Sequence, residues 1–122
     1  MNLYISHSSS FDFASELYLP IKKSSSDKQH NIVLPHEKTS ELFDSKEYFA
    51  ICNLVIAEIS YPSTGMGIEL GWAELMKVPI VGLYKKDTQP SKSALSICKK
   101  LYTYETPKEI SNIIDTIVSE YE

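Results

Sequence analysis

The chain has 122 residues, of which 43% are hydrophobic and 23% are charged. This length is typical of one domain around one core, and the composition excludes a largely disordered chain. Twelve basic and sixteen acidic residues give a formal charge of −4, and the lysine pairs at 22–23, 85–86 and 99–100 are scattered. We therefore predict a single domain over residues 1–122 that does not bind duplex nucleic acid, which requires a concentrated basic face.

The spacing of cysteines and histidines indicates the redox compartment of the protein and whether it binds a metal. Cys52 and Cys98 form no CxxC motif, and the N-terminus does not resemble a signal peptide, so we expect a cytoplasmic protein with reduced thiols. No apolar run approaches the roughly 20 residues needed to span a bilayer, so no membrane association is expected. His7, His30 and His36 lack a metal-ligand spacing, and we expect neither a metal nor a cofactor.

Short apolar runs alternate along the chain with segments of helical periodicity. The expected strands are residues 2–6, 31–34, 53–58, 78–84 and 101–104. The expected helices follow them, at residues 11–18 with an end at Pro20, at 40–52, 67–76 and 91–100, and from Pro107 to the C-terminal residues. The last helix is the clearest, because its isoleucines recur at helical spacing behind a proline.

Five strands alternating with five helices predict a three-layer α/β domain with a doubly wound parallel sheet of the flavodoxin-like or Rossmann-like type. In the common strand order 2-1-3-4-5, ligands bind beyond the carboxyl ends of the first and third strands, where the order reverses. Those ends are residues 6–10 and 58–69. We therefore expect the serine-rich loop and the glycine-bearing loop to face each other across a crevice.

The segment 53–73 is typical of a buried strand, a glycine-bearing loop and the start of a helix. Gly65 and Gly67 allow positive φ or a close approach of backbone to ligand. Glu69 is expected on the first helical turn, where free amides and the helix dipole favour the ionised carboxylate that a nucleophile requires. A capping role explains Glu69 equally well, and the two glycines could serve only a tight turn.

A resemblance to a known family adds to this interpretation. The sequences Val55-Ile-Ala-Glu58 and Pro62-Ser63-x-Gly65-x-Gly67-x-Glu69 resemble the signature of the nucleoside 2-deoxyribosyltransferase superfamily. That superfamily includes 2'-deoxynucleoside 5'-monophosphate N-glycosidases. The resemblance implies that Glu69 attacks C1' of the deoxyribose and releases the base, leaving a glycosyl ester that water or a second base resolves.

The resemblance also implies how a phosphate is held and how subunits assemble. Ser63 would contact the 5'-phosphate, and Ser93 would reach it from the neighbouring subunit of a homodimer or a higher homo-oligomer. A turn or cap role explains both serines without chemistry. The full set of substrate-binding residues that we predict is Ser6, His7, Ser8, Glu58, Ser63, Gly65, Gly67 and Ser93.

The chain departs from this family at two places. The family carries an aspartate thirteen residues before the glutamate that ends the third strand, and counting back from Glu58 gives Ser45. Asp44 is adjacent and Glu47 is near, but a shift of one helical residue turns a side chain by about 100°. The family's glycine-rich, arginine-bearing first loop is replaced by residues 7–10, His-Ser-Ser-Ser, which implies weaker phosphate binding or a different ligand.

Three functions remain open on the sequence alone. The leading hypothesis is an N-glycosidase or deoxyribosyltransferase for nucleosides or their 5'-monophosphates, with Glu69 as nucleophile and Asp44 as acid. The second is a nucleotide-binding or signalling module that has lost turnover, because the family aspartate is missing. The third and weaker hypothesis is an NAD glycohydrolase, because Tyr4-Ile-Ser-His-Ser8 resembles the first strand of TIR domains.

Overall fold

Five parallel strands form the centre of the molecule, and the computed structural model describes residues 1–37 and 45–122. The strands lie in the order β2-β1-β3-β4-β5, which confirms the predicted fold class and topology. They are β1 (Asn2–His7), β2 (Asn31–Val33), β3 (Leu54–Glu58), β4 (Ile80–Lys85) and β5 (Lys100–Tyr104).

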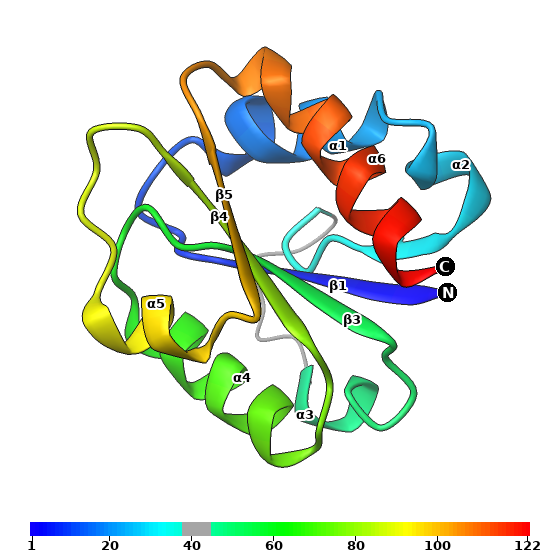
Figure 1. Ribbon diagram of the computed structural model, residues 1–122, viewed down its shortest axis with the longest axis vertical. Helices are drawn as coiled ribbons and strands as arrows, with labels where there is room; N and C mark the ends of the chain where they lie inside the picture. Colours follow the sequence, from blue (N-terminus) through cyan, green and yellow to red (C-terminus); the bar gives the residue numbers. More distant parts are fainter. Residues whose placement is uncertain (38–44) are drawn as a thin grey trace.

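Helices cover both faces of the sheet, as Figure 1 shows. One face carries α1 (Leu19–Lys22), α2 (Ser26–Gln29) and α6 (Ile110–Tyr121), with the short turns η1 (Ala14–Tyr18) and η2 (Pro107–Glu109) leading into α1 and α6. The other face carries α3 (Ser45–Tyr48), α4 (Thr64–Leu75) and α5 (Lys92–Ile97).

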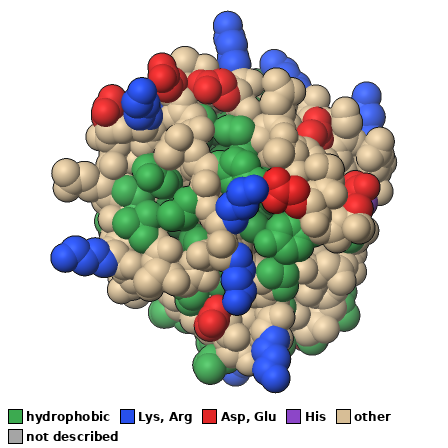
Figure 2. Space-filling model, in the orientation of Figure 1, with side chains coloured by type: hydrophobic (Ala, Val, Ile, Leu, Met, Phe, Trp, Pro, Cys, Tyr) green, Lys and Arg blue, Asp and Glu red, His purple; other side chains and the backbone are tan. Residues whose placement is uncertain are grey.

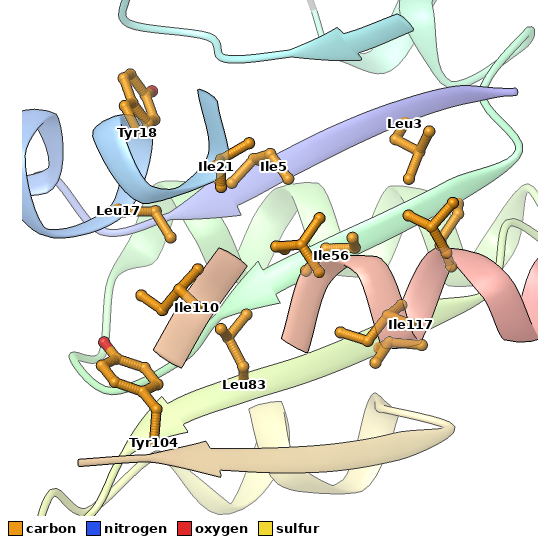
Figure 3. Packing of buried hydrophobic residues seen from close by; sticks show 14 residues of the cluster. Leu3, Ile5, Leu17, Tyr18, Ile21, Ile56, Leu83, Tyr104, Ile110 and Ile117 are labelled. Carbon is orange, nitrogen blue, oxygen red and sulfur yellow. The ribbon is translucent and has the colours of Figure 1, made fainter. Parts of the chain in front are cut away.

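Alternation along the strands divides the core into two clusters. Leu3 and Ile5 of β1 pack with α1 and α6, whereas Tyr4 packs with α3 and α4. Figure 3 shows the first cluster, in which Ile56 and Leu83 of the strands lie against Ile110 and Ile117 of α6. Side chains at the end of β1 therefore point in alternating directions, toward α4 or toward η1.

The first helix does not end at Pro20 as expected. The chain passes from the π-helical turn η1 into α1 and continues through Pro20 to Lys22. Proline has no backbone N–H, so it cannot complete an ordinary helical hydrogen bond, and a wider turn before it accommodates the missing bond. The next expected helix, over residues 40–52, is observed as α3 from Ser45 to Tyr48, and its first five residues lie outside the described part of the chain.

The surface shown in Figure 2 carries lysine and acidic side chains interspersed with hydrophobic ones. In the part of the chain that the structure describes, no helix is long and apolar enough to cross a membrane. Cys52 and Cys98 are both free thiols. Burial raises the pKa of each to about 11, so neither is a thiolate at neutral pH.

Candidate functional site

The carboxylate of Glu69 lies where the end of β1 meets α4. The phenol of Tyr4 donates to Glu69 Oε2 at 2.6 Å, and the hydroxyl of Ser6 donates to Oε1 at 2.9 Å. Tyr4 and Ser6 share one face of β1 because strand side chains alternate. Each of the two carboxylate oxygens of Glu69 therefore accepts a hydrogen bond from a hydroxyl of β1, and the side chain is half-buried.

The start of α4 differs from the prediction, and so does the reason why Glu69 is held. The helix begins at Thr64, not near Gly67, because the hydroxyl of Ser63 caps it and accepts from the Met66 amide at 3.3 Å. Glu69 therefore lies in the second turn, beyond the free amides of the helix N-terminus. Both the expected hold by those amides and the capping alternative for Glu69 are wrong, and side chains of β1 hold it instead.

Gly65 and Gly67 are helical residues of α4, and neither has a positive φ. The expected loop conformation is therefore wrong, as is the alternative of a tight turn. A Cβ atom at Gly67 would meet nothing within 4 Å, so space is open above this turn. The two glycines add no side chain at their own positions near the start of α4, the helix that carries Glu69.

Ser45 occupies the place of the family aspartate, and the structure brings it to the Glu69 site. It is buried, and its hydroxyl is hydrogen-bonded to the Tyr4 phenol. Burial raises the pKa of Tyr4, and the charge and hydrogen bond of Glu69 raise it further, while Ser45 acts in the opposite direction. Tyr4 is therefore a protonated donor to Glu69. Asp44, the predicted acid, lies outside the described residues.

His7 and Ser8 are buried in the loop that follows β1. Burial lowers the pKa of His7 to about 4, so its ring is neutral at neutral pH. His7 Nδ1 is 2.8 Å from the Ser8 carbonyl oxygen, which requires a donor there, so Nε2 accepts from the Tyr18 hydroxyl at 2.6 Å. Burial, and to a smaller degree the charge of Glu69, raises the pKa of Tyr18 to about 12. His7 and Tyr18 thus form a neutral pair on the side of β1 that faces η1.

Aromatic rings gather around His7, which the sequence did not lead us to expect. The ring of Phe13 lies 4.7 Å from His7, and Phe11 lies 5.0 Å from Tyr61. Phe11 and Phe13 were expected within the first helix, but they precede the helical residues that begin at Ala14, and both pack against the core as partly buried side chains. Because Phe11 follows β1 and Tyr61 follows β3, their contact joins the two predicted loops. The sequence feature that could have indicated this group of rings is Phe-Asp-Phe at residues 11–13, directly after the serine-rich loop.

Glu58 does not line the crevice as predicted, because it is fully buried. Its Oε1 accepts from the Ser60 amide at 2.7 Å, and its Oε2 accepts from the hydroxyls of Ser60 and Tyr104. Burial raises its pKa, and these hydrogen bonds oppose that shift. Glu58 instead binds the amide of Ser60 in the loop after β3, which is a structural role.

Ser93 lies on the exposed surface of α5, outside the group that surrounds Glu69. The neighbouring Ser91, not Ser93, caps α5 by accepting from the Ala94 amide at 3.2 Å. The capping alternative for Ser93 is therefore wrong. Its exposure is compatible with a role toward a neighbouring subunit.

A hollow of about 400 Å³ at the ends of β4 and β5 is lined in part by Tyr84, Lys86, Tyr104 and Glu105. None of the predicted site residues contributes to it. Lys86 and Glu105 are highly exposed and pair with each other, which is ordinary surface chemistry. We place the candidate site at Glu69, where a half-buried carboxylate accepts hydrogen bonds from the hydroxyls of Tyr4 and Ser6.

Two known proteins are similar to this chain. A protein of Syntrophotalea carbinolica with the provisional name 2'-deoxynucleoside 5'-phosphate N-hydrolase 1 is 40% identical over 43 residues, which are 35% of this chain and 30% of that protein. The CMP N-glycosidase BcmB of Clostridium botulinum has a similar structure, with a TM-score of 0.64 over 94% of this chain and 99% of that one. The resemblance to the nucleoside 2-deoxyribosyltransferase superfamily is confirmed.

The two similarities differ in what they establish. The match to the hydrolase covers less than a third of that protein. The glycosidase is only 21% identical in sequence, so its structure establishes the fold alone. No protein-family model matches the chain.

Proposed function

We propose that this protein cleaves or transfers the N-glycosidic bond of nucleosides or nucleoside 5'-monophosphates, with Glu69 as the nucleophile. The observation that carries the proposal is the setting of Glu69. Its carboxylate is half-buried at the end of β1, and the hydroxyls of Tyr4 and Ser6 bind one oxygen each. The names of the two similar proteins, an N-hydrolase and an N-glycosidase, support the same bond as the target.

In the proposed reaction a Glu69 oxygen forms a bond to C1' of the sugar while the bond from C1' to the base nitrogen breaks. The electron pair of that bond leaves with the base, which takes a proton from an acid, and Asp44 is the residue we propose for it. Water then attacks C1', releases Glu69 and restores the enzyme; a second base in place of water gives transfer. Hydrogen bonds from Tyr4 and Ser6 hold the carboxylate in one orientation before the attack.

The test is release of free base from a panel of deoxynucleosides, their 5'-monophosphates and NAD, measured by chromatography with the purified protein and with Glu69→Gln. Glu74→Gln is the matched control, because Glu74 lies exposed on the same helix. A 2-fluoro sugar analogue that stalls the second step should add its mass to the peptide that contains Glu69. Base release that persists in Glu69→Gln would contradict the proposal, and release from NAD alone would favour the TIR-like alternative.

A non-catalytic nucleotide-binding module is the second candidate, because Ser45 stands where the family carries its aspartate. A serine hydroxyl is too weak an acid to protonate a leaving base at neutral pH. Calorimetric binding of a nucleotide, together with no base release over hours, would favour this candidate. Release that Glu69→Gln abolishes would exclude it.

We further propose that the protein forms a homodimer through the outer face of α4. Ile68 is 49% exposed there, Leu75 is 83% exposed and Met76 is 40% exposed. The adjacent Ile51, which follows α3, is 61% exposed, and α3 contacts α4. Large apolar side chains gathered on an exposed helix face are typical of an interface with another protein, so this face suits a second copy of the chain.

The dimer is tested by light scattering after gel filtration. The unchanged protein should have the mass of two chains, and Leu75→Lys should have the mass of one while keeping its circular dichroism. Leu19→Lys is the control, because Leu19 is 49% exposed on α1, on the opposite face of the sheet. A monomer at a concentration of about 100 μM, where even weak contacts of micromolar affinity are formed, would contradict the proposal.

A further inference from the structure

We infer that the site takes nucleosides with an uncharged 5' end in preference to nucleoside 5'-monophosphates. This inference rests on the proposed function and narrows its substrate class. The names of both similar proteins describe nucleotide substrates, so this chain would differ from them. Three observations carry it: the charges of the chain, the hydrogen bonds of the serines in the two loops, and the neutral donors that bind Glu69.

The first observation is the supply of cations. The sequence contains no arginine, so the planar, bidentate contact that arginine makes with phosphate is not available. Among the described residues, three lysines have an acidic partner: Lys22 binds Glu37, Lys86 binds Glu105 and Lys100 binds Glu120. None of these pairs includes a residue that contacts Glu69. His7 adds no charge, because its ring is neutral at neutral pH.

The second observation is that the hydroxyls predicted to bind phosphate already have partners. Ser8 Oγ accepts from the Ser10 amide at 3.0 Å and lies 2.8 Å from Ser10 Oγ. Ser63 Oγ caps α4 by accepting from Met66, and the Ser63 carbonyl accepts from the Gly67 amide at 3.0 Å. A serine that accepts from an amide still has its O–H to donate, so each of these two hydroxyls offers a ligand at most one neutral donor and no charge.

The third observation is the surroundings of Glu69 itself. Among the described residues, the hydrogen bonds to its carboxylate come from the neutral hydroxyls of Tyr4 and Ser6, and in the loops that follow β1 and β3 the rings of Phe11 and Tyr61 lie 5.0 Å apart. A phosphate dianion brought close to a carboxylate without a cation is repelled and loses its water shell. An uncharged sugar hydroxyl needs only hydrogen bonds, and a base can stack on the rings.

The first experiment compares kcat/KM for matched pairs: thymidine with dTMP, deoxycytidine with dCMP, and deoxyadenosine with dAMP. The nucleoside should be favoured by about tenfold or more, which corresponds to about 1.4 kcal/mol. Inorganic phosphate should not compete with nucleosides. An equal kcat/KM for the nucleoside and its monophosphate, a preference for the monophosphate, or competition by inorganic phosphate would overturn the inference.

Equilibrium binding separates this inference from the proposed function. If neither the nucleosides nor their monophosphates are turned over, calorimetric titration with thymidine and with dTMP still shows which of the two is preferred. The titration is done on Glu69→Gln and on the unchanged protein. Tighter binding of thymidine supports the inference while the proposed catalysis fails. Tighter binding of dTMP, equal binding, or no binding of either overturns it.

A charge added to the first loop provides an independent test. Ser9 is exposed between Ser8 and Ser10, so Ser9→Arg supplies the cation that the loop lacks. It should shift the preference toward the monophosphate by about tenfold, since a charge-assisted contact contributes about 1.5–3 kcal/mol. Ser119→Arg, at an exposed position on α6, should leave the preference unchanged. An unchanged preference in Ser9→Arg would overturn the inference.

Discussion

Glu58 and Glu69 have the same kinds of partner but different surroundings. Each accepts hydrogen bonds from one tyrosine and one serine: Glu58 from Tyr104 and Ser60, and Glu69 from Tyr4 and Ser6. Glu58 also accepts from a backbone amide and is fully buried, whereas Glu69 is half-buried. The hydrogen-bond partners alone therefore do not distinguish a structural carboxylate from a candidate nucleophile.

What separates the two glutamates is which elements their hydrogen bonds join. Glu58 binds Ser60, whose hydroxyl accepts from the Lys85 amide at 2.7 Å, so this network joins the ends of β3, β4 and β5. Among the described residues, the hydrogen bonds of Glu69 join α4 to β1, and its side chain is half-buried where that of Glu58 is fully buried. We infer that Glu58 fixes the edge of the sheet on which the Glu69 site is built.

The largest expected effect is the loss of base release in Glu69→Gln. Because an amide is not a nucleophile, the rate should fall by a factor of about 1,000 or more, while the free energy of unfolding changes by less than about 1 kcal/mol. Single-turnover base release and urea unfolding measure the two quantities. If Glu69→Gln instead unfolds readily while its folded fraction remains active, Glu69 has a structural role and is not the nucleophile.

The opposite result is expected for Glu58→Ala. Removing this carboxylate leaves the Ser60 amide and the hydroxyls of Ser60 and Tyr104 without their buried acceptor. Unfolding should become easier by about 3–5 kcal/mol, with activity per folded molecule largely retained. Urea unfolding checks the first part and active-site titration the second. A loss of activity in fully folded Glu58→Ala would show that Glu58 acts in the reaction.

The two tyrosines sharpen the comparison with smaller effects. Tyr4→Phe removes a donor to a carboxylate, and such bonds contribute about 1.5–3 kcal/mol, so kcat/KM should fall by about 10- to 100-fold with little change in unfolding. Tyr104→Phe should instead lower the free energy of unfolding by a similar amount and leave kcat/KM nearly unchanged. If both variants change the same quantity, the two hydroxyls do not serve different functions.

The sheet could be predicted because its information is local. Apolar runs, turn residues and the isoleucines of α6 mark each element within a few positions, and the rule for doubly wound sheets then gives the strand order. The same rule predicted that the ends of β1 and β3 meet, and the structure brings Ser6 to Glu69. The short helix α2 was missed because its polar residues carry no periodicity; Asp115, far along the chain, binds the amides of Ser25 and Ser26 and stabilises it.

The parts of the site that could not be predicted depend on distant partners. Nothing near Glu58 in the sequence shows that Tyr104 will bind it, so the burial of Glu58 could not be predicted from the sequence. Tyr4 looks like an ordinary strand residue, and only the packing of α4 on β1 turns its hydroxyl into a donor to Glu69. At the start of α4, two glycines disfavour a helix locally, and burial of Met66, Leu70 and Ala73 overrides that preference.

The smallest expected effect is a pH dependence that belongs to Glu58. Burial raises its pKa above the ordinary value of 4.5, so the folded protein binds this proton more tightly than the unfolded chain. The stability that Glu58 contributes is therefore full below about pH 4.5 and is lost as pH rises through the raised value. Glu58→Gln cannot titrate, so its free energy of unfolding, relative to that of the unchanged protein, should increase with pH.

Urea unfolding of both proteins between about pH 4 and pH 8 measures this difference. Burial lowers the pKa of His7 to about 4, which weakens both proteins as pH falls below the ordinary value of 6.5, and this contribution cancels in the difference. Parallel curves for Glu58→Gln and the unchanged protein would mean that the buried carboxylate of Glu58 keeps an ordinary proton affinity, which would contradict the prediction.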